Sequence, residues 1–230
     1  MKIVIISDLH GNYDALSALP ETGDELWVLG DLVNYGPQPR EVVEHVRRHA
    51  NLVMRGNHDH AVGFQADPRC TPRYREMALT TMQYSSARLD SSDKEYLRGL
   101  PLTVTVQCDG RNFFLCHAVP SNPLFGYCPE DSVQWIEEVA KANAPDFLFV
   151  GHTHTPFVRK IGKTMIVNPG SLGQPKTGRP DACYAVWEDG KIELKQFVYP
   201  MEETVRRIGA MPVPVEVVHD LVTVLRTGSV

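Results

Sequence analysis

The sequence predicts an α/β fold in which two mixed β-sheets pack face to face as a sandwich, with helices on the outer faces. Two observations carry this prediction. In residues 2–54, short apolar runs alternate with helical patterns, which is typical of parallel βαβ units. In residues 102–198, most apolar runs come in pairs around short turns that contain Gly, which indicates antiparallel hairpins. A sandwich of two sheets accommodates both halves.

The first half supplies strands and helices in alternation. Because these runs are apolar and end in polar turns, strands are expected at Lys2–Ile6, Glu25–Leu29 and Asn51–Met54. Apolar residues at helical spacing predict helices at Tyr13–Leu19 and Arg40–His49. Asn12 stands at the N-cap position of the first helix, and Pro20 ends it.

The second half supplies mainly hairpins. Paired strands are expected at Leu102–Gln107 with Asn112–Cys116, Phe157–Ile161 with Thr164–Val167, and Cys183–Trp187 with Ile192–Val198. A buried strand is expected at Phe147–Val150, after an amphipathic helix at Asp131–Ala142. Two short helices separated by Pro212 and Pro214 are expected in Met201–Val230, and the sequence assigns them no function.

Residues 61–99 interrupt the strand pattern with two expected helices, Tyr74–Arg88 and Ser92–Arg98. This helical insert lies between two loops that carry polar motifs, which makes it a candidate lid over a site. The alternative is an ordinary packing layer. In both cases we expect residues 1–230 to form a single domain.

Composition excludes several classes of protein. A formal net charge of −5 provides no basic footprint for broad nucleic-acid binding. No apolar run approaches the roughly 18 residues of a membrane span, and the first run lacks the features of a signal peptide. The odd number of cysteines, 5 in all, and the lack of a close pair argue against a disulfide framework, so we expect a cytoplasmic protein.

Polar side chains with metal-binding chemistry follow the predicted strands. These residues are Asp8, His10, Asp31, Asn57, His117, His152 and His154. Each is unremarkable alone, since a turn aspartate or a core histidine would explain it. However, the carboxyl ends of strands in an open α/β sheet converge on one crevice, so these residues are expected to meet there. Nitrogen and oxygen ligands without thiolate suit Mn²⁺, Fe, Zn²⁺ or Co²⁺.

Several short motifs make the chain recognisable. They are Asp8-x-His10 with Gly11-Asn12, Gly30-Asp31, Gly56-Asn57-His58-Asp59, His117 and Gly151-His152-Thr153-His154. In order and spacing they resemble the motifs of the calcineurin-like metallophosphoesterase superfamily. Asn168-Pro169-Gly170-Ser171 is similar to the small bacterial and archaeal phosphodiesterase branch. The resemblance covers about residues 1–175.

The resemblance implies two divalent transition-metal ions that share one carboxylate. By position, one ion would be held by Asp8, His10, Asp31 and His154. The second would be held by Asp31, Asn57, His117 and His152. Mn²⁺ is our first expectation, with Fe, Zn²⁺, Co²⁺ and Ni²⁺ as alternatives.

The implied reaction is direct hydrolysis by a metal-bridging hydroxide, because coordination lowers the pKa of water. His58 would act as general acid or charge stabiliser at the leaving oxygen, oriented by Asp59. Arg55 would hold a substrate phosphate, unless it forms a structural ion pair. Asn12 would contact the phosphoryl group or only cap its helix.

The functional expectation is a metal-dependent phosphoesterase for small-molecule substrates, and first of all a phosphodiesterase. A phosphomonoesterase, a protein phosphatase or a dinucleoside polyphosphate hydrolase would use the same ligands. A non-catalytic protein-binding scaffold of the same fold is the alternative from another class. Tyr35, Phe64 and Phe125 are candidates for stacking a nucleobase, although scattered exposed aromatic residues are common. A homo-oligomer is left open.

Overall fold

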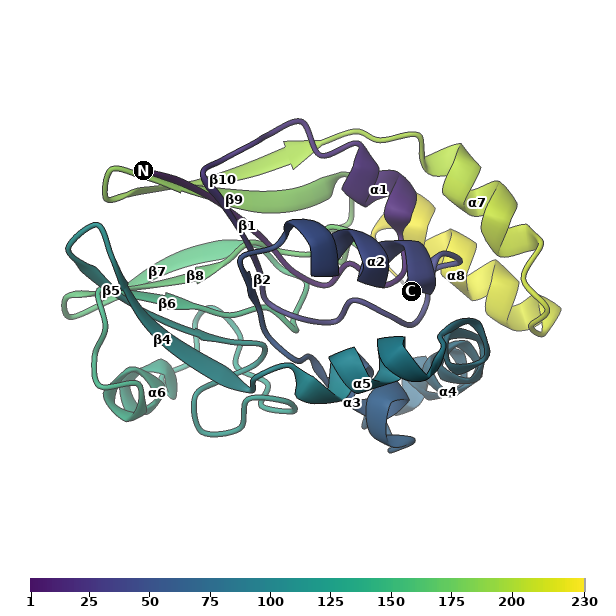
Figure 1. The fold of residues 1–230 in the computed structure, drawn as a ribbon, viewed down its shortest axis with the longest axis horizontal. Helices are drawn as coiled ribbons and strands as arrows, with labels where there is room; N and C mark the ends of the chain where they lie inside the picture. The colour runs from purple at the N-terminus through teal and green to yellow at the C-terminus, as the bar shows by residue number, and fades with distance from the viewer. Residues whose placement is uncertain (230) are drawn as a thin grey trace.

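A computed structural model, which describes residues 1–229, contains two mixed sheets of five strands each (Figure 1). The strand order in the first sheet is β10 (Lys191–Phe197), β9 (Ala182–Glu188), β1 (Lys2–Ile6), β2 (Glu25–Val28) and β3 (Leu52–Val53). In the second sheet it is β4 (Thr103–Cys108), β5 (Arg111–Cys116), β6 (Phe147–Phe149), β8 (Thr164–Asn168) and β7 (Phe157–Ile161). The predicted fold class is confirmed.

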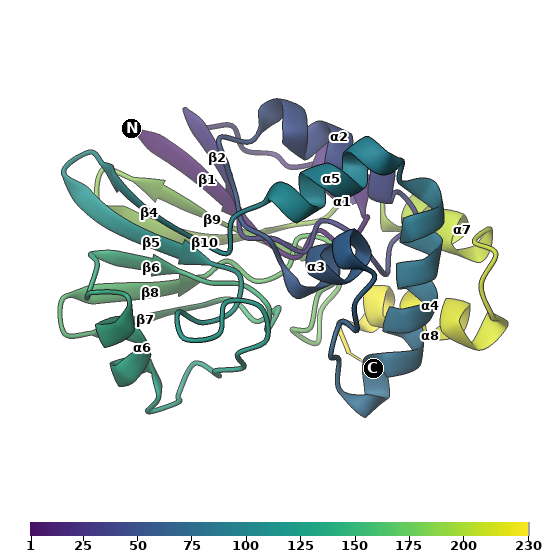
Figure 2. The same ribbon diagram turned by 60° about the horizontal axis from the view of Figure 1, so that its bottom comes forward.

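Eight helices connect and cover the sheets within the described residues. They are α1 (Tyr13–Ser17), α2 (Pro39–His49), α3 (Asn57–Phe64), α4 (Pro72–Arg88), α5 (Ser91–Gly99), α6 (Trp135–Lys141), α7 (Met201–Gly209) and α8 (Val215–Thr227). Figures 1 and 2 show α6 beside the second sheet, while the other helices gather at the opposite end of the molecule. No helix in residues 1–229 is long and apolar enough to cross a lipid bilayer.

Strand direction follows the predicted division. In the first sheet β1, β2 and β3 run parallel, and the β9–β10 hairpin joins β1 in antiparallel pairing. In the second sheet β5, β6 and β8 run parallel, with β4 and β7 as antiparallel edges. The parallel strands are neighbours in each sheet, in the order β1, β2, β3 and in the order β5, β6, β8, so their carboxyl ends lie side by side.

The main core lies between the sheets and follows from the alternation of strand side chains. Ile3 and Ile5 of β1 face inward and belong to the same buried cluster as Trp27 and Phe113. The Trp27 and Phe113 rings pack edge to face with centroids 5.2 Å apart. Helices α1 and α2 cover the opposite face of the first sheet, and α6 covers the outer face of the second.

Helix α1 ends at Ser17, before the predicted Leu19, and β3 is shorter than predicted. Two helices differ more from the sequence prediction. Helix α3 begins at Asn57, in a motif for which the sequence predicts a loop. The helix starts there because the Asp59 side chain accepts a hydrogen bond from the backbone of Gly56 and stabilises the first turn. Helix α6 begins at Trp135 and not at Asp131. The Ser132 side chain accepts a hydrogen bond from the backbone N–H of Gln134, and such local bonds compete with helix formation.

The helical insert packs into the molecule. Helix α5 contacts α3, and α4 contacts α3, α2 and α8. Within the insert, the cavity described below is bordered only by the loop before α4 and by the first turn of this helix. The helices of the insert thus form a packing layer, and closure of the preceding loop as a lid stays a prediction.

Candidate active site

Two buried clusters of polar side chains lie at the carboxyl ends of the central strands. Asp8, His10 and His154 form the first cluster, and Asp31, His117 and His152 form the second. Within each cluster the potential ligand atoms lie within 4.8 Å of one another. The Asp31 carboxylate lies 3.2 Å from Nε2 of His117 and 3.8 Å from Nε2 of His10. The structure therefore brings the predicted ligands together, with Asp31 between the clusters.

A left-handed backbone conformation orients most of these side chains. Asp8, His10, Asp31, His152 and His154 all have φ between 45° and 66°, in the left-handed region that non-glycine residues rarely adopt. Each strand thus ends in a sharp change of direction that turns its side chain into the crevice. Backbone conformations of this kind concentrate at functional sites.

Glycines precede three of the ligand loops, at Gly30, Gly56 and Gly151, because the backbone is crowded there. A Cβ atom at Gly56 would collide with the Asp31 carboxylate, and one at Gly151 would collide with the Ser7 hydroxyl. The repeated pattern of glycine before a polar ligand therefore has a steric cause. A larger residue would displace Asp31, the side chain that both clusters share.

Three histidines are oriented by backbone carbonyls. The Nδ1 atoms of His10, His117 and His154 lie 3.1, 2.8 and 2.6 Å from the carbonyl oxygens of Val33, Leu29 and Gln174, respectively. A neutral ring whose Nδ1–H donates to a carbonyl keeps the Nε2 lone pair free, and this lone pair faces the cluster. Carbonyl partners of this kind are typical of metal-ligating histidines.

The first cluster fits a cation. Nε2 of His10 and Nε2 of His154 lie 3.1 Å apart, so two lone pairs meet at one point. Oδ1 of Asp8 is buried without a hydrogen-bond partner among the described residues and lies 3.2 Å from Nε2 of His154. Burial opposes ionisation of this carboxyl, but the electrostatic effect of the neighbouring His154 imidazole holds the pKa of Asp8 below its ordinary value.

The second cluster gains an amide oxygen. Oδ1 of Asn57 lies 3.1 Å from both Nε2 of His117 and Nδ1 of His152. The amide nitrogen of Asn57 donates to the Pro68 carbonyl at 2.9 Å, which fixes the oxygen toward the cluster. Burial lowers the pKa of His152 to about 3, so its ring is neutral and available as a ligand.

His58 lies beside the clusters on α3, and its side chain is positioned by Asn34. The amide nitrogen of Asn34 lies 2.7 Å from Nδ1 of His58, and the backbone N–H of His58 donates to Asp31 at 2.8 Å. Nε2 of His58 faces the cavity and lies 3.6 Å from the thiol of Cys70. The sequence analysis did not single out Asn34, because its signal is only its position three residues after Asp31.

The prediction that Asp59 orients His58 is wrong. The Asp59 carboxylate accepts hydrogen bonds from the backbone N–H groups of Asp31 (2.8 Å), Leu32 (2.8 Å) and Gly56 (3.0 Å). Burial raises the pKa of Asp59 to about 6. This residue therefore holds the Asp31 loop against the start of α3, and its contribution to the site is indirect.

The substrate contacts predicted for Arg55 and Asn12 are also corrected. Arg55 donates to the Arg98 carbonyl at 2.7 Å and lies over the Phe64 ring, outside the cavity. Asn12 is 1% exposed. Its oxygen caps α1 at Ala15, and its amide nitrogen donates to Gly173, so no surface of this side chain faces a substrate. Asn12 follows the structural alternative that the sequence left open. Arg55 does not, because within the described residues it binds a carbonyl and not the carboxylate of an ion pair.

A cavity of about 320 Å³ opens over the clusters. It is lined by Asp31, Tyr35, Asn57, His58, Arg69, Cys70, Thr71, Tyr74, Phe125, Tyr127, His152, Thr153, His154 and Lys176. Arg69, Cys70 and Lys176 are additions to the predicted site. No sequence motif marks them, because they lie on irregular loops that only the folded chain brings to the cavity.

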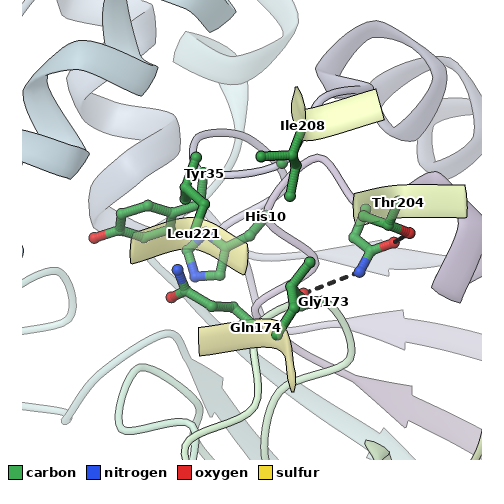
Figure 3. A pocket seen from close by; sticks show the side chains of 10 residues that line it. His10, Tyr35, Gly173, Gln174, Thr204, Ile208 and Leu221 are labelled. Carbon is green, nitrogen blue, oxygen red and sulfur yellow. Dashed lines mark hydrogen bonds between the residues drawn. The ribbon is translucent and has the colours of Figure 1, made fainter. Parts of the chain in front are cut away.

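A second, small cavity of about 10 Å³ lies behind the first cluster. Figure 3 shows His10 and Tyr35 on one side of it and Ile208, Leu221 and Gln174 around the rest. Ile208 and Leu221 come from the C-terminal helices α7 and α8. These helices, to which the sequence assigned no function, thus cover the back of the site.

Comparisons with known proteins agree with this geometry. A sequence model of the calcineurin-like phosphoesterase superfamily domain matches residues 1–189. The chain is 31% identical over 229 residues to the uncharacterized protein MJ0912 of Methanocaldococcus jannaschii, covering 90% of this chain and 91% of that one. It is 27% identical to the phosphodiesterase YfcE of Escherichia coli K12, covering 84% and 91%. A crystal structure of a metallophosphoesterase from Sphaerobacter thermophilus superposes with a TM-score of 0.81 at 29% identity, covering 96% and 98%.

Proposed function

Because the chain belongs to the calcineurin-like phosphoesterase superfamily and is a metal-dependent phosphoester hydrolase, we propose that it hydrolyses small-molecule phosphodiesters with two metal ions. The observation that carries this proposal is the pair of ligand clusters joined at Asp31, with His58 beside them in one cavity. Similarity to a named phosphodiesterase over most of the chain supports the diester preference.

The residues present fit two divalent cations. Asp8, His10 and His154 would hold one ion, His117, His152 and Asn57 the other, and Asp31 both. When bound, the ions would lower the pKa of water and neutralise charge on the phosphoryl oxygens. Imidazole nitrogens and carboxylate and amide oxygens without thiolate suit Mn²⁺, Fe, Zn²⁺ and Co²⁺ alike. Among these ions Mn²⁺ is the one that we propose and that the test below supplies.

His58 acts on the leaving group in this proposal. The amide N–H of Asn34 donates to Nδ1, so the proton of the neutral ring lies on Nε2, which faces the cavity. During hydrolysis an oxygen from water forms a bond to phosphorus, the P–O bond to the leaving group breaks, and the leaving oxygen gains negative charge. The Nε2–H of His58 donates to this oxygen and stabilises the charge.

The volume of the cavity indicates the size of the substrate, and the state of the cysteines indicates the cellular compartment. A volume of about 320 Å³ suits a small molecule, since ligand pockets of this kind begin at roughly 300 Å³. All five cysteines are free thiols, which supports a reducing compartment. We therefore place the enzyme and its substrate in the cytoplasm.

The test is hydrolysis of bis(p-nitrophenyl) phosphate and of p-nitrophenyl phosphate by protein that has been stripped of metal and then supplied with Mn²⁺. The proposal expects metal-dependent turnover and a higher kcat/KM for the diester. A preference for the monoester would make the protein a phosphomonoesterase. Stoichiometric metal binding without turnover of either ester would favour a non-catalytic scaffold.

A further inference from the structure

The cavity contains two side-chain cations that the metal clusters do not explain. Lys176 and Arg69 both line it, from the loop after β8 and the loop before α4. Among residues 1–229, neither has a carboxylate oxygen within 4.0 Å, although most other cations near the site are paired or bonded to a carbonyl. Cations without a carboxylate partner at the wall of a cavity are available to an anionic ligand.

Both cations are held in place by aromatic rings. Nζ of Lys176 lies 4.6 Å from the centroid of the Tyr74 ring, and the guanidinium of Arg69 lies 4.6 Å from the centroid of the Phe125 ring. Cation–π contacts fix the direction of a side chain without neutralising its charge. Neither cation is therefore neutralised by its ring contact.

The loops that carry these cations are anchored. The backbone N–H of Arg69 donates to Asp67 at 2.8 Å, and Asp67 pairs with Arg75 at 2.7 Å. On the other side, the backbone N–H of Gly178 donates to the carbonyl of Gly228, directly after α8, at 3.1 Å. In the chain, Lys176 thus lies between Gln174, whose carbonyl is bonded to His154, and Gly178, which is attached to the end of α8.

Lys176 lines the same cavity as residues of both metal clusters. Asp31 and His154 lie on its wall, and His58 lies beside them. An anion bound at Lys176 would consequently be adjacent to a phosphoryl group bound at the clusters. With two divalent ions present, the lining carries more positive charge than a diester with a single negative charge can balance.

Tyr127 provides an aromatic surface at the rim. Its side chain is 67% exposed, and its ring lies edge to face with His152 at a centroid distance of 6.4 Å. Unlike Tyr74 and Phe125, it has no cation over its face among the described residues. A planar base that stacks on an exposed aromatic ring binds about tenfold more tightly than one that does not stack.

We infer that the cavity recognises nucleotides with two or more linked phosphates, with Lys176 and Arg69 binding the phosphate next to the scissile one and Tyr127 stacking the base. This inference rests on the proposed function and narrows its substrate class. The scissile bond is then a P–O bond of the phosphate chain, water supplies the new oxygen, and both products leave as phosphates. Of the three aromatic residues that the sequence offered for stacking, only Phe125 lies at this part of the cavity with a cation over it.

The first experiment compares ADP and AMP as competitive inhibitors of bis(p-nitrophenyl) phosphate hydrolysis with Mn²⁺ in excess. We expect ADP to inhibit about tenfold more strongly than AMP, because only ADP offers a second phosphate. In Lys176→Met this ratio should fall toward one, while Lys176→Arg should retain most of it. The exposed Lys163→Met serves as the matched control and should keep the wild-type ratio.

The second experiment compares kcat/KM for diadenosine tetraphosphate with kcat/KM for bis(p-nitrophenyl) phosphate. Lys176→Met should lower the ratio of the two constants by tenfold or more, mainly through KM for the nucleotide. Any general effect of the substitution on turnover cancels in this ratio. Tyr127→Ala should weaken inhibition by ADP and inhibition by AMP by the same factor of about ten, since both nucleotides carry the base.

The results separate this inference from the proposed function. If wild-type protein hydrolyses the simple diester but binds ADP and AMP equally well, the inference is overturned and the proposed function stands. A wild-type inhibition ratio that persists in Lys176→Met would also overturn it. If no ester is hydrolysed, the proposed function fails, and calorimetric binding of ADP and AMP to the Mn²⁺-loaded protein still decides the role of Lys176.

Discussion

The stability of the metal-free protein should depend on pH through His117. This ring is buried, and although burial lowers its pKa, the charge and hydrogen bond of Asp31 raise the pKa of His117 to about 9. The ordinary value of a histidine is about 6.5. The folded protein therefore holds this proton more tightly than the unfolded chain does.

The sign and size follow from this difference. Below about pH 6.5 both states are protonated and the stabilisation is fully present; it is lost as pH rises through 9. A difference of about 2.5 units corresponds to about 3 kcal/mol of unfolding free energy. A bound metal ion would replace the proton, so the stabilisation by Mn²⁺ should increase over the same pH range.

The assay is urea unfolding in the presence of a chelator at pH 6, 7.5 and 9.5. Other groups titrate as well, so the informative quantity is the difference between wild type and His117→Asn. This difference should shrink by about 3 kcal/mol from pH 6 to pH 9.5. The exposed His219→Asn is the control and should follow wild type. A wild-type pH profile parallel to that of His117→Asn would refute the pairing of His117 with Asp31.

Three further predictions concern residues around the clusters. His58→Ala should retain both metal ions, measured by elemental analysis, and lose about 10²–10⁴-fold in kcat, the usual contribution of a positioned proton donor; unchanged turnover would exclude His58 from the reaction. Asp59→Ala leaves three buried N–H groups without an acceptor, at about 1–3 kcal/mol each. Removal of a buried charge offsets part of this cost, and the urea midpoint should still fall; a normal midpoint with reduced turnover would restore the orienting role. Gly56→Ala places a methyl group against Asp31 and should weaken Mn²⁺ binding in calorimetry, whereas Gly209→Ala, with nothing within 4 Å of the added atom, should bind as wild type does.

The sequence predicted the strands well and marked the candidate ligands, because both have local signals. A buried strand such as Lys2–Ile6 is a continuous apolar run, and each ligand follows such a run directly. Helix α3 was missed because its stability comes from the Asp59 cap and from packing against α5, which are visible only in the fold. The patterns were thus sufficient wherever a few neighbouring residues determine the structure.

The residues that surround the candidate ligands could not be predicted in the same way. Asn34 contacts His58, which is 24 residues away, and Asp59 binds the backbone of Asp31, which is 28 residues away. Lys176 reaches the cavity from a loop that only the fold brings there, and no spacing rule connects these residues to their partners. Arg55 and Asn12 failed as substrate contacts for the same reason. Their neighbours in sequence belong to the site, but their side chains turn toward Arg98 and Gly173.

The left-handed backbone at five of the ligands has a consequence for how this protein tolerates change. Each such conformation costs a non-glycine residue roughly 1–2 kcal/mol, and the fold bears this cost whether or not a metal is bound. Glycine at His152 would relieve part of it and could make the metal-free protein more stable while removing a ligand. Selection for thermal stability alone, without selection for turnover, should therefore drive these positions toward glycine. The aspartate and histidine residues at these positions thus lower the stability of the protein in return for metal-binding side chains.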